Sequence, residues 1–317
     1  MRRAQPHQVS VPRPSRHLFL AVLLAWIHAG TCPATEISWI PAHHLAPQET
    51  SHRVWCGGLD GDLDDDISFV APGVHYWNAG QPRSPVWIRD DSVFAGIPSC
   101  SFRAGALGDL DADGDHDLVI TCDDRELRCY WNTGSCTEPV WEYDPSEFDG
   151  LLILEGGAEP YLVDLDANLD LDLVVVIAWD RLTLFRNVGI PSDPEWSYEG
   201  VIPNIIIAEA PHPTAALADL DGDGDVDAVA VTWDTPVQCW ENAGTPEDFM
   251  FVENPEWVQN GALAPQGGRG IDFLDVDADG DLDLIVASME GCNLLYLNEG
   301  FVPVAPLSWG RIKALYR

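Results

Sequence analysis

Basic residues are scarce in this sequence: 16 lysines and arginines stand against 52 aspartates and glutamates, giving a formal net charge of −36 at pH 7. Four of those arginines lie within residues 1–34, which contain no acid, so 16 minus 4, or 12, basic residues face all 52 acids in the rest of the chain. Such a surface repels phosphate groups. Nucleic acid is therefore excluded as a partner, anionic lipid is a poor one, and we expect the acids to attract cations.

Long apolar runs are missing too. The run from Leu18 to Ile27 spans only ten residues, follows the four arginines and precedes small residues. Ten residues are too few to cross a bilayer, whereas a basic, an apolar and a small-residue segment in that order are typical of a secretory signal. We predict that residues 1–34 are a signal peptide cleaved after Ala29 or Ala34. The mature chain would then have no transmembrane span and be secreted, to the extracellular space, the cell surface or the periplasm.

The sequence also lacks the motifs of common enzyme classes. It contains no CxxC, no Cys/His cluster, no HExxH, no GxSxG, no phosphate-binding glycine loop and no sialidase-type Asp box. Its cysteines agree with an oxidising compartment. Cys122 and Cys129 flank a predicted turn, DDRE, so a hairpin disulfide between them is one of the pairings that the sequence allows.

What the sequence does have is a repeat. Five acidic segments each precede an apolar run: GLDGDLDDDISFV, DLDADGDHDLVI, DLDANLDLDLVVV, DLDGDGDVDAVAV and DVDADGDLDLIVA. Their last loop aspartates are Asp66, Asp117, Asp172, Asp227 and Asp283, in steps of 51, 55, 55 and 56 residues. A second motif follows in phase, at Asn78, Asn132, Asn187, Asn242 and Asn298, and a third carries Trp87, Trp141 and Trp196. Three motifs in fixed order indicate one structural unit used five times.

Each unit predicts about four short antiparallel strands and no helix, because apolar runs of strand length alternate with turn residues. Radial repetition of such units hides their sheet edges, which is how a β-propeller is built. We therefore predict an all-β fold, a propeller of five four-stranded blades, with an incomplete or a larger ring as the alternatives. The propeller would span residues 35–310 and leave a basic tail at 311–317. The strand at Trp39 would complete the last blade, with Trp309 as a rival for that position.

The acidic loops predict calcium sites. In the pattern DxDxDGxxD, carboxylates at positions 1, 3, 5 and 9 converge on one point, position 7 adds its carbonyl, and the glycine at position 6 permits the sharp turn. Ligation by oxygen alone in a flexible loop suits Ca²⁺ better than Mg²⁺ or thiophilic metals. Three loops fit the pattern fully: Asp109, Asp111, Asp113, Asp115 and Asp117; Asp219, Asp221, Asp223, Asp225 and Asp227; Asp275, Asp277, Asp279, Asp281 and Asp283.

The other two loops depart from the pattern, so we expect between three and five bound ions. The third loop in the chain has Leu169 in the glycine position and offers Asp164, Asp166, Asn168, Asp170 and Asp172, which predicts weaker binding. The first loop has Gly58 at position 1 and Leu63 in the glycine position. It retains Asp60, Asp62, Asp64 and Asp66 and is the loop most expected to be empty.

These motifs make the chain resemble the FG-GAP or VCBS repeat family, which is related to the calcium-bearing blades of integrin α-subunit propellers. The resemblance covers roughly Ile37 to Trp309. It implies that the loops lie at one rim of the propeller, that calcium is structural there, and that the opposite face is open to ligands. The departure is the number of blades, since integrin-like propellers have seven and five repeats are counted here.

Two functions follow as hypotheses, because a fold does not dictate one. The first is a secreted, calcium-stabilised binding module for a protein or a glycan, without catalytic residues. The alternative is a carbohydrate-active enzyme, a polysaccharide lyase or glycoside hydrolase, in which two carboxyls would face each other about 5 to 10 Å apart. Its candidate acids lie outside the repeated motifs: Asp90, Asp91, Glu155, Glu159, Asp180 and Asp234. For each of these acids, a solvent-exposed loop residue is the more ordinary interpretation. The repeated tryptophans could stack on sugars, but core packing between blades explains their regular positions better.

Overall fold

The structure is a computed structural model that describes most of the chain between residues 39 and 298. The described ranges are 39–48, 53–60, 65–69, 73–81, 84–97, 104–122, 126–149, 151, 159–177, 181–207, 213–232, 235–259, 268–277, 279–288 and 293–298. The predicted signal peptide, the basic tail and Trp309 lie outside these ranges. Within them, no helix is long and apolar enough to cross a membrane.

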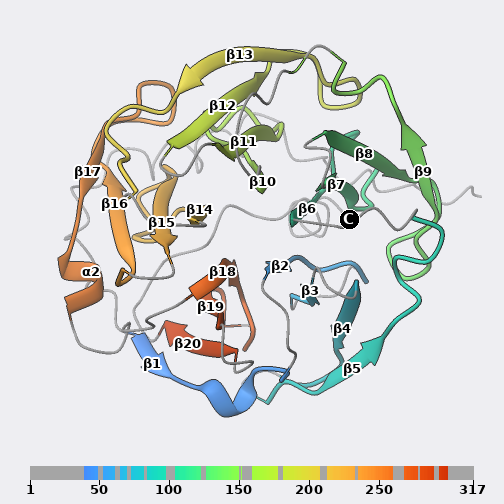
Figure 1. The fold of residues 1–317 in the computed structure, drawn as a ribbon, viewed down its shortest axis with the longest axis horizontal. Helices are drawn as coiled ribbons and strands as arrows, with labels where there is room; N and C mark the ends of the chain where they lie inside the picture. The colour runs from blue at the N-terminus through green and yellow to red at the C-terminus, as the bar shows by residue number, and fades with distance from the viewer. Residues whose placement is uncertain are drawn as a thin grey trace, which may run out of the picture. The chain divides into compact units, whose positions relative to one another are not determined.

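The chain forms five four-stranded antiparallel sheets arranged around a common centre (Figure 1). From the centre outward, the first four blades are β2 (Val54–Cys56), β3 (Ile67–Phe69), β4 (Val74–Asn78) and β5 (Trp87–Asp90); β6 (Ala104–Gly108), β7 (Asp117–Thr121), β8 (Leu127–Asn132) and β9 (Trp141–Asp144); β10 (Glu159–Val163), β11 (Asp172–Ile177), β12 (Arg181–Asn187) and β13 (Trp196–Val201); and β14 (Thr214–Ala218), β15 (Asp227–Val231), β16 (Gln238–Asn242) and β17 (Phe251–Glu253). Besides the strands, the described residues contain only a 3₁₀ turn at His43–Leu45 and the four-residue helix α2 at Glu256–Gln259. The predicted five-bladed propeller is confirmed.

The fifth blade closes the ring by joining the two ends of the described chain. It consists of β18 (Gly268–Leu274), β19 (Asp283–Ser288), β20 (Leu294–Asn298) and β1 (Trp39–Pro41). Trp39 lies opposite Asn298, in the same register as Trp87 opposite Asn78. The prediction that the Trp39 strand completes the last blade is therefore correct. Pairing the first strand with the last leaves no blade incomplete, which removes an edge open to aggregation.

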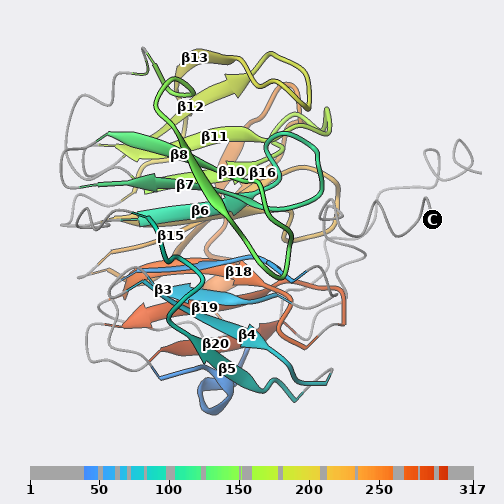
Figure 2. The ribbon, with the colours of Figure 1, turned by 90° about the vertical axis from the view of Figure 1, so that its right-hand side faces the viewer.

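The apolar core lies between neighbouring blades. Viewed from the side, β6, β7 and β8 of one blade follow one another (Figure 2). The second strands are buried along their whole length, as in DLVIT of β7 and DAVAV of β15, because other blades cover both of their faces. Close approach is needed here: a Cβ at Gly105 in the inner strand β6 would lie 3.3 Å from the Trp55 ring of the preceding blade.

The repeated tryptophans tie each outer strand to the preceding connection. The indole nitrogen of Trp87 donates to the carbonyl oxygen of Leu45 at 2.6 Å, and that of Trp141 donates to the carbonyl of Val93 at 2.7 Å. Trp196 donates to a carboxylate oxygen of Glu147 at 2.6 Å. These partly buried rings pack against the cores between blades, as predicted.

One disulfide option is wrong. Cys129 is a free, buried thiol, whereas Cys122 is disulfide-bonded, so the two do not form a hairpin bridge. The register explains why: Cys129 of β8 lies opposite Val119 of β7, three residues away from Cys122.

Candidate metal centres

Each acidic loop joins the inner strand of a blade to its second strand. In the second blade, Asp109 directly follows β6 and Asp117 is the first residue of β7. The carboxyl ends of four inner strands line one pocket together with acidic-loop residues, so the loops gather at one end of the central channel. This arrangement agrees with the expectation, drawn from the family resemblance, that the acidic loops lie at one rim of the propeller.

Three loops bring carboxylates together closely enough to hold a metal ion. One oxygen from each member of a triad lies within 4.8 Å of the others. The triads are Asp109, Asp111 and Asp117; Asp219, Asp221 and Asp227; and Asp275, Asp277 and Asp279. They occur in the three loops that fit the sequence pattern fully. The other predicted acids of these loops, Asp113, Asp115, Asp223, Asp225, Asp281 and Asp283, lie outside the triads.

The residues present fit calcium. The donors are all oxygens, which this ion prefers. Asp225 and Asp281 are 6% and 7% exposed, and each has a buried carboxylate oxygen without a hydrogen-bond partner. Burying such an oxygen unpaired is unfavourable, and an ion within the loop would satisfy it. Gly224 and Gly280 both have φ of 99°, a conformation that favours glycine and turns the loop back on itself.

The last aspartate of each loop also has a structural role that the sequence pattern did not reveal. One oxygen of Asp117 accepts the backbone N–H of Leu110 at 2.9 Å, and the other accepts that of Asn132 at 2.8 Å. Asp66, Asp172, Asp227 and Asp283 make the equivalent pair of bonds. This aspartate therefore connects the loop to the start of the asparagine motif. The signal was the spacing between the two motifs, which is 15 residues in four of the repeats.

The asparagine continues the chain of hydrogen bonds outward. The side-chain oxygen of Asn242, which is fully buried, accepts the backbone N–H groups of Gly244 at 3.1 Å and Met250 at 2.8 Å. It thereby holds the connection that leads into the outer strand of the blade.

We predict that Asn242→Ala lowers the free energy of unfolding by about 2 kcal/mol, because two backbone donors lose their acceptor at about 1 kcal/mol each. Chemical denaturation in saturating calcium measures this. Asp248→Asn, at an exposed site in the same blade, is the control and should change stability by less than about 0.5 kcal/mol. Equal effects of the two changes would contradict the role given to Asn242.

Burial raises the pKa of the loop carboxyls. It raises the pKa of Asp117 to about 8 and those of Asp227 and Asp283 to about 9, even though backbone N–H groups oppose the shift. A raised pKa in the folded state favours folding at low pH, and that contribution is lost as pH rises from the ordinary value near 4 through the folded value.

We therefore predict that the metal-free protein becomes less stable between pH 5 and pH 9. Thermal unfolding in EDTA across this range measures the effect. Saturating calcium should flatten the decline, because the ion stabilises the ionised carboxylates. A midpoint in EDTA that rises with pH would contradict the prediction.

The third loop holds an internal cation in place of a triad. A guanidinium nitrogen of Arg186 in β12 forms an ion pair with Asp166 and lies 3.6 Å from Asp172. Leu169 has φ of 77°, a strained conformation at the position where the complete loops have glycine. Although all residues of this loop are described, they form no triad. Arg186 thus supplies positive charge to acids of the third loop, where the complete loops have triads that could hold a metal ion.

The first loop is described only in part, since Asp62 and Asp64 lie outside the described residues. Asp66 carries the two backbone bonds noted above, and one of its oxygens is 3.7 Å from Nε2 of the buried His75. The described part of this loop contributes no triad.

The acids proposed for an enzyme have other partners where they are described. Asp90 accepts hydrogen bonds from Ser92 and from the indole of Trp77. Asp91 pairs with Arg89 at the exposed edge, and Glu159 forms a buried ion pair with Arg53 of another blade. Glu155, Asp180 and Asp234 lie outside the described residues. Among Asp90, Asp91 and Glu159, no two form a pair of facing free carboxyls.

Comparison with known protein families supports the repeat that the sequence shows. The family model described as FG-GAP-like repeat matches residues 109–175 and 219–286. Each match begins at the first aspartate of one acidic loop and extends through the next, so the two matches cover four of the five loops. No curated protein matches the chain.

Among solved structures, the chain is similar to BBS1N in a complex with ARL6DN, at 9% identity over 85% of this chain and 97% of that one, with a TM-score of 0.39. It is also similar to TcdB2-TccC3, at 12% identity over 82% of this chain but only 15% of that one, with a TM-score of 0.41. Similarity at this level carries no functional argument. The chain is a five-bladed β-propeller that carries FG-GAP-like repeats.

Proposed function

We propose that this protein is a secreted binding module for a protein or a glycan, and that Ca²⁺ in three of its loops stabilises the blades. The main support for calcium binding is the set of three carboxylate triads in the corresponding loops of three blades. Once bound, calcium would supply positive charge at each triad and hold the loop against the start of its second strand. Secretion rests on the predicted signal at residues 1–34.

The arrangement of the ring supports binding more than catalysis. The described candidate acids are engaged with hydrogen-bond or ion-pair partners, and the loop aspartates are suited to a metal. The outermost strands also expose apolar side chains in every blade: Ile40, Ile88, Tyr143, Tyr198 and Val252. Exposed apolar groups at regular intervals are compatible with a protein ligand. The face opposite the loops remains the proposed site for a glycan.

Calorimetric titration of metal-free protein with calcium tests the metal part of the proposal, and we expect three ions per chain. Glycan arrays and screens against secreted proteins, run in calcium and in EDTA, test the binding part. Binding that requires calcium would support the module. Cleavage of a polysaccharide by the purified protein would contradict it and favour the enzyme. An absence of calcium uptake would exclude metal stabilisation.

A further inference from the structure

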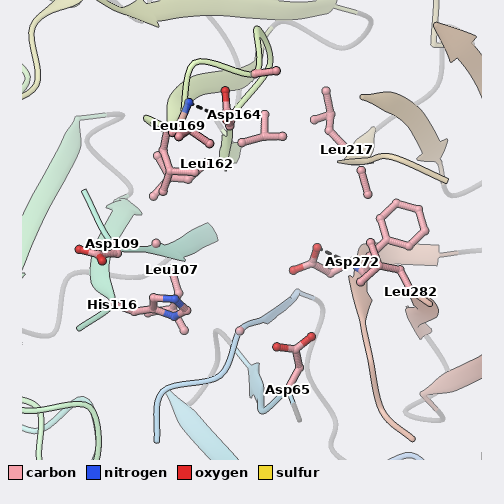
Figure 3. A pocket seen from close by; sticks show the side chains of 17 residues that line it. Asp65, Leu107, Asp109, His116, Leu162, Asp164, Leu169, Leu217, Asp272 and Leu282 are labelled. Atoms are coloured by element: carbon pink, nitrogen blue, oxygen red, sulfur yellow. Dashed lines mark hydrogen bonds between the residues drawn. The ribbon is translucent and has the colours of Figure 1, made fainter. Parts of the chain in front are cut away.

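A pocket of about 470 Å³ lies at the loop-bearing end of the central channel (Figure 3). It is lined by 17 residues from all five blades. Its volume falls within the range of pockets that take small organic ligands. Because every blade contributes to its wall, the pocket exists only in the closed ring.

The wall of this channel-mouth pocket is mostly apolar. Leucine side chains project from successive blades, at Leu107, Leu162, Leu217 and Leu282. Phe273 also lines the pocket. An apolar ligand body placed against them would leave water, which is favourable in proportion to the area buried. The pocket is therefore built to hold a ligand with an apolar part.

Four carboxylates stand around the wall of the pocket, at Asp65, Asp109, Asp164 and Asp272. Of these, Asp109 and Asp164 are among the predicted metal ligands. Asp65 and Asp272 come from neighbouring blades, and the side chain of Asp272 points into the space in Figure 3. The two carboxylates are held by backbone groups: Asp65 accepts the N–H of Asp275 at 2.9 Å, and Asp272 accepts that of Cys56 at 2.7 Å. Neither was among the predicted metal ligands.

None of the 17 lining residues, all of them described, is lysine or arginine. Burial raises the pKa of Asp272 to about 7, although the backbone N–H groups of Cys56 and Phe273 oppose the shift. Across the pocket, Nδ1 of His116 is buried and has no hydrogen-bond partner. A ligand that places a cation beside Asp272 and offers a hydrogen-bonding group to His116 would stabilise the ionised carboxylate and give the ring nitrogen a partner.

We propose that the channel-mouth pocket binds an organic cation, with an ammonium group at Asp65 and Asp272 and an apolar body against the leucines. The occupant is either a free amine or a lysine side chain presented by a partner, since both have this chemistry. Such a site rests on the function proposed above and deepens it, by adding a ligand class and a place on the loop-bearing end.

The test uses three probes with the same apolar body, 4-phenylbutylamine, 4-phenylbutanol and 5-phenylvalerate, titrated against the whole protein in saturating calcium. We expect the amine to bind at least about tenfold more tightly than the alcohol, because only the amine pairs with the carboxylates. The carboxylate probe should not bind. Asp272→Asn should weaken amine binding about tenfold and leave alcohol binding unchanged. Glu142→Gln, which removes one charge from an exposed site on β9, should change neither.

Additional titrations distinguish a lysine side chain of a partner from a free amine. A short peptide that binds with lysine but not with acetyl-lysine would assign the site to a partner side chain, and binding of the amine alone would assign it to a free ligand. Equal binding of amine and alcohol, or no binding of the amine in saturating calcium, would overturn the proposal. If Asp272→Asn unfolds, Asp65→Asn replaces it as the test. Calcium uptake measured on the same samples distinguishes the failures, because three bound ions without amine binding would leave the proposed function intact.

Discussion

Saturating calcium is expected to raise the midpoint of thermal unfolding by at least about 10 °C over the value in EDTA, while magnesium has little effect. An ion that binds only the folded state contributes about 2.7 kcal/mol per site at a free concentration one hundred times its dissociation constant. Three sites would give about 8 kcal/mol, and each kcal/mol shifts the midpoint by about 2–4 °C in a domain of this size. The lower figure allows for calcium bound by the acidic unfolded chain.

A variant of one triad tests whether the shift comes from the loops. Asp221→Asn should remove roughly a third of the calcium-dependent shift and lower the stoichiometry from three ions to two, because Asp221 belongs to one triad of three. Asp248→Asn removes the same charge from an exposed site in that blade and should leave both quantities unchanged. If the two variants respond alike, the shift reflects general screening of the net charge.

Replacing Arg186 is expected to cost more than replacing any exposed arginine. Arg186→Met keeps an apolar stem but leaves Asp166 and the fully buried Asp172 without their cation. Loss of one partner from a buried ion pair costs about 3–5 kcal/mol, and we expect about 3 because Arg186 is 18% exposed. Chemical denaturation in EDTA measures this cost.

The matched control for Arg186 is Arg89→Met. Arg89 and Asp91 form an ion pair whose side chains are 44% and 67% exposed, so its loss should cost less than about 1 kcal/mol. Calcium at millimolar concentration should restore part of the stability of Arg186→Met, by occupying the third loop as a fourth, weak site. If calcium does not restore stability, the guanidinium does not stand in for a metal there.

The fold and the complete loops were predictable because both are local and periodic. The nine residues of a complete loop are adjacent in the sequence, and a glycine such as Gly224 permits the sharp turn that brings the aspartates together. The loop pattern therefore predicted a metal-binding turn without knowledge of the rest of the fold. The three motifs recur about every 55 residues, which fixed the number and order of the blades. The sequence offered both Trp39 and Trp309 for the closing strand, and the pairing of Trp39 with Asn298 in the structure shows that the Trp39 strand takes this position.

The tertiary structure alone decided which charges meet. Arg186 lies 20 residues beyond Asp166 and only the pairing of β11 with β12 brings its guanidinium to the third loop. The pairing of Glu159 with Arg53 of another blade was likewise beyond local patterns. The channel-mouth pocket has no sequence signature, because its wall is assembled from single residues of five blades. Local hydrogen bonds and turn geometry determine the blade and its loop, whereas closure of the ring determines which side chains face one another across the centre.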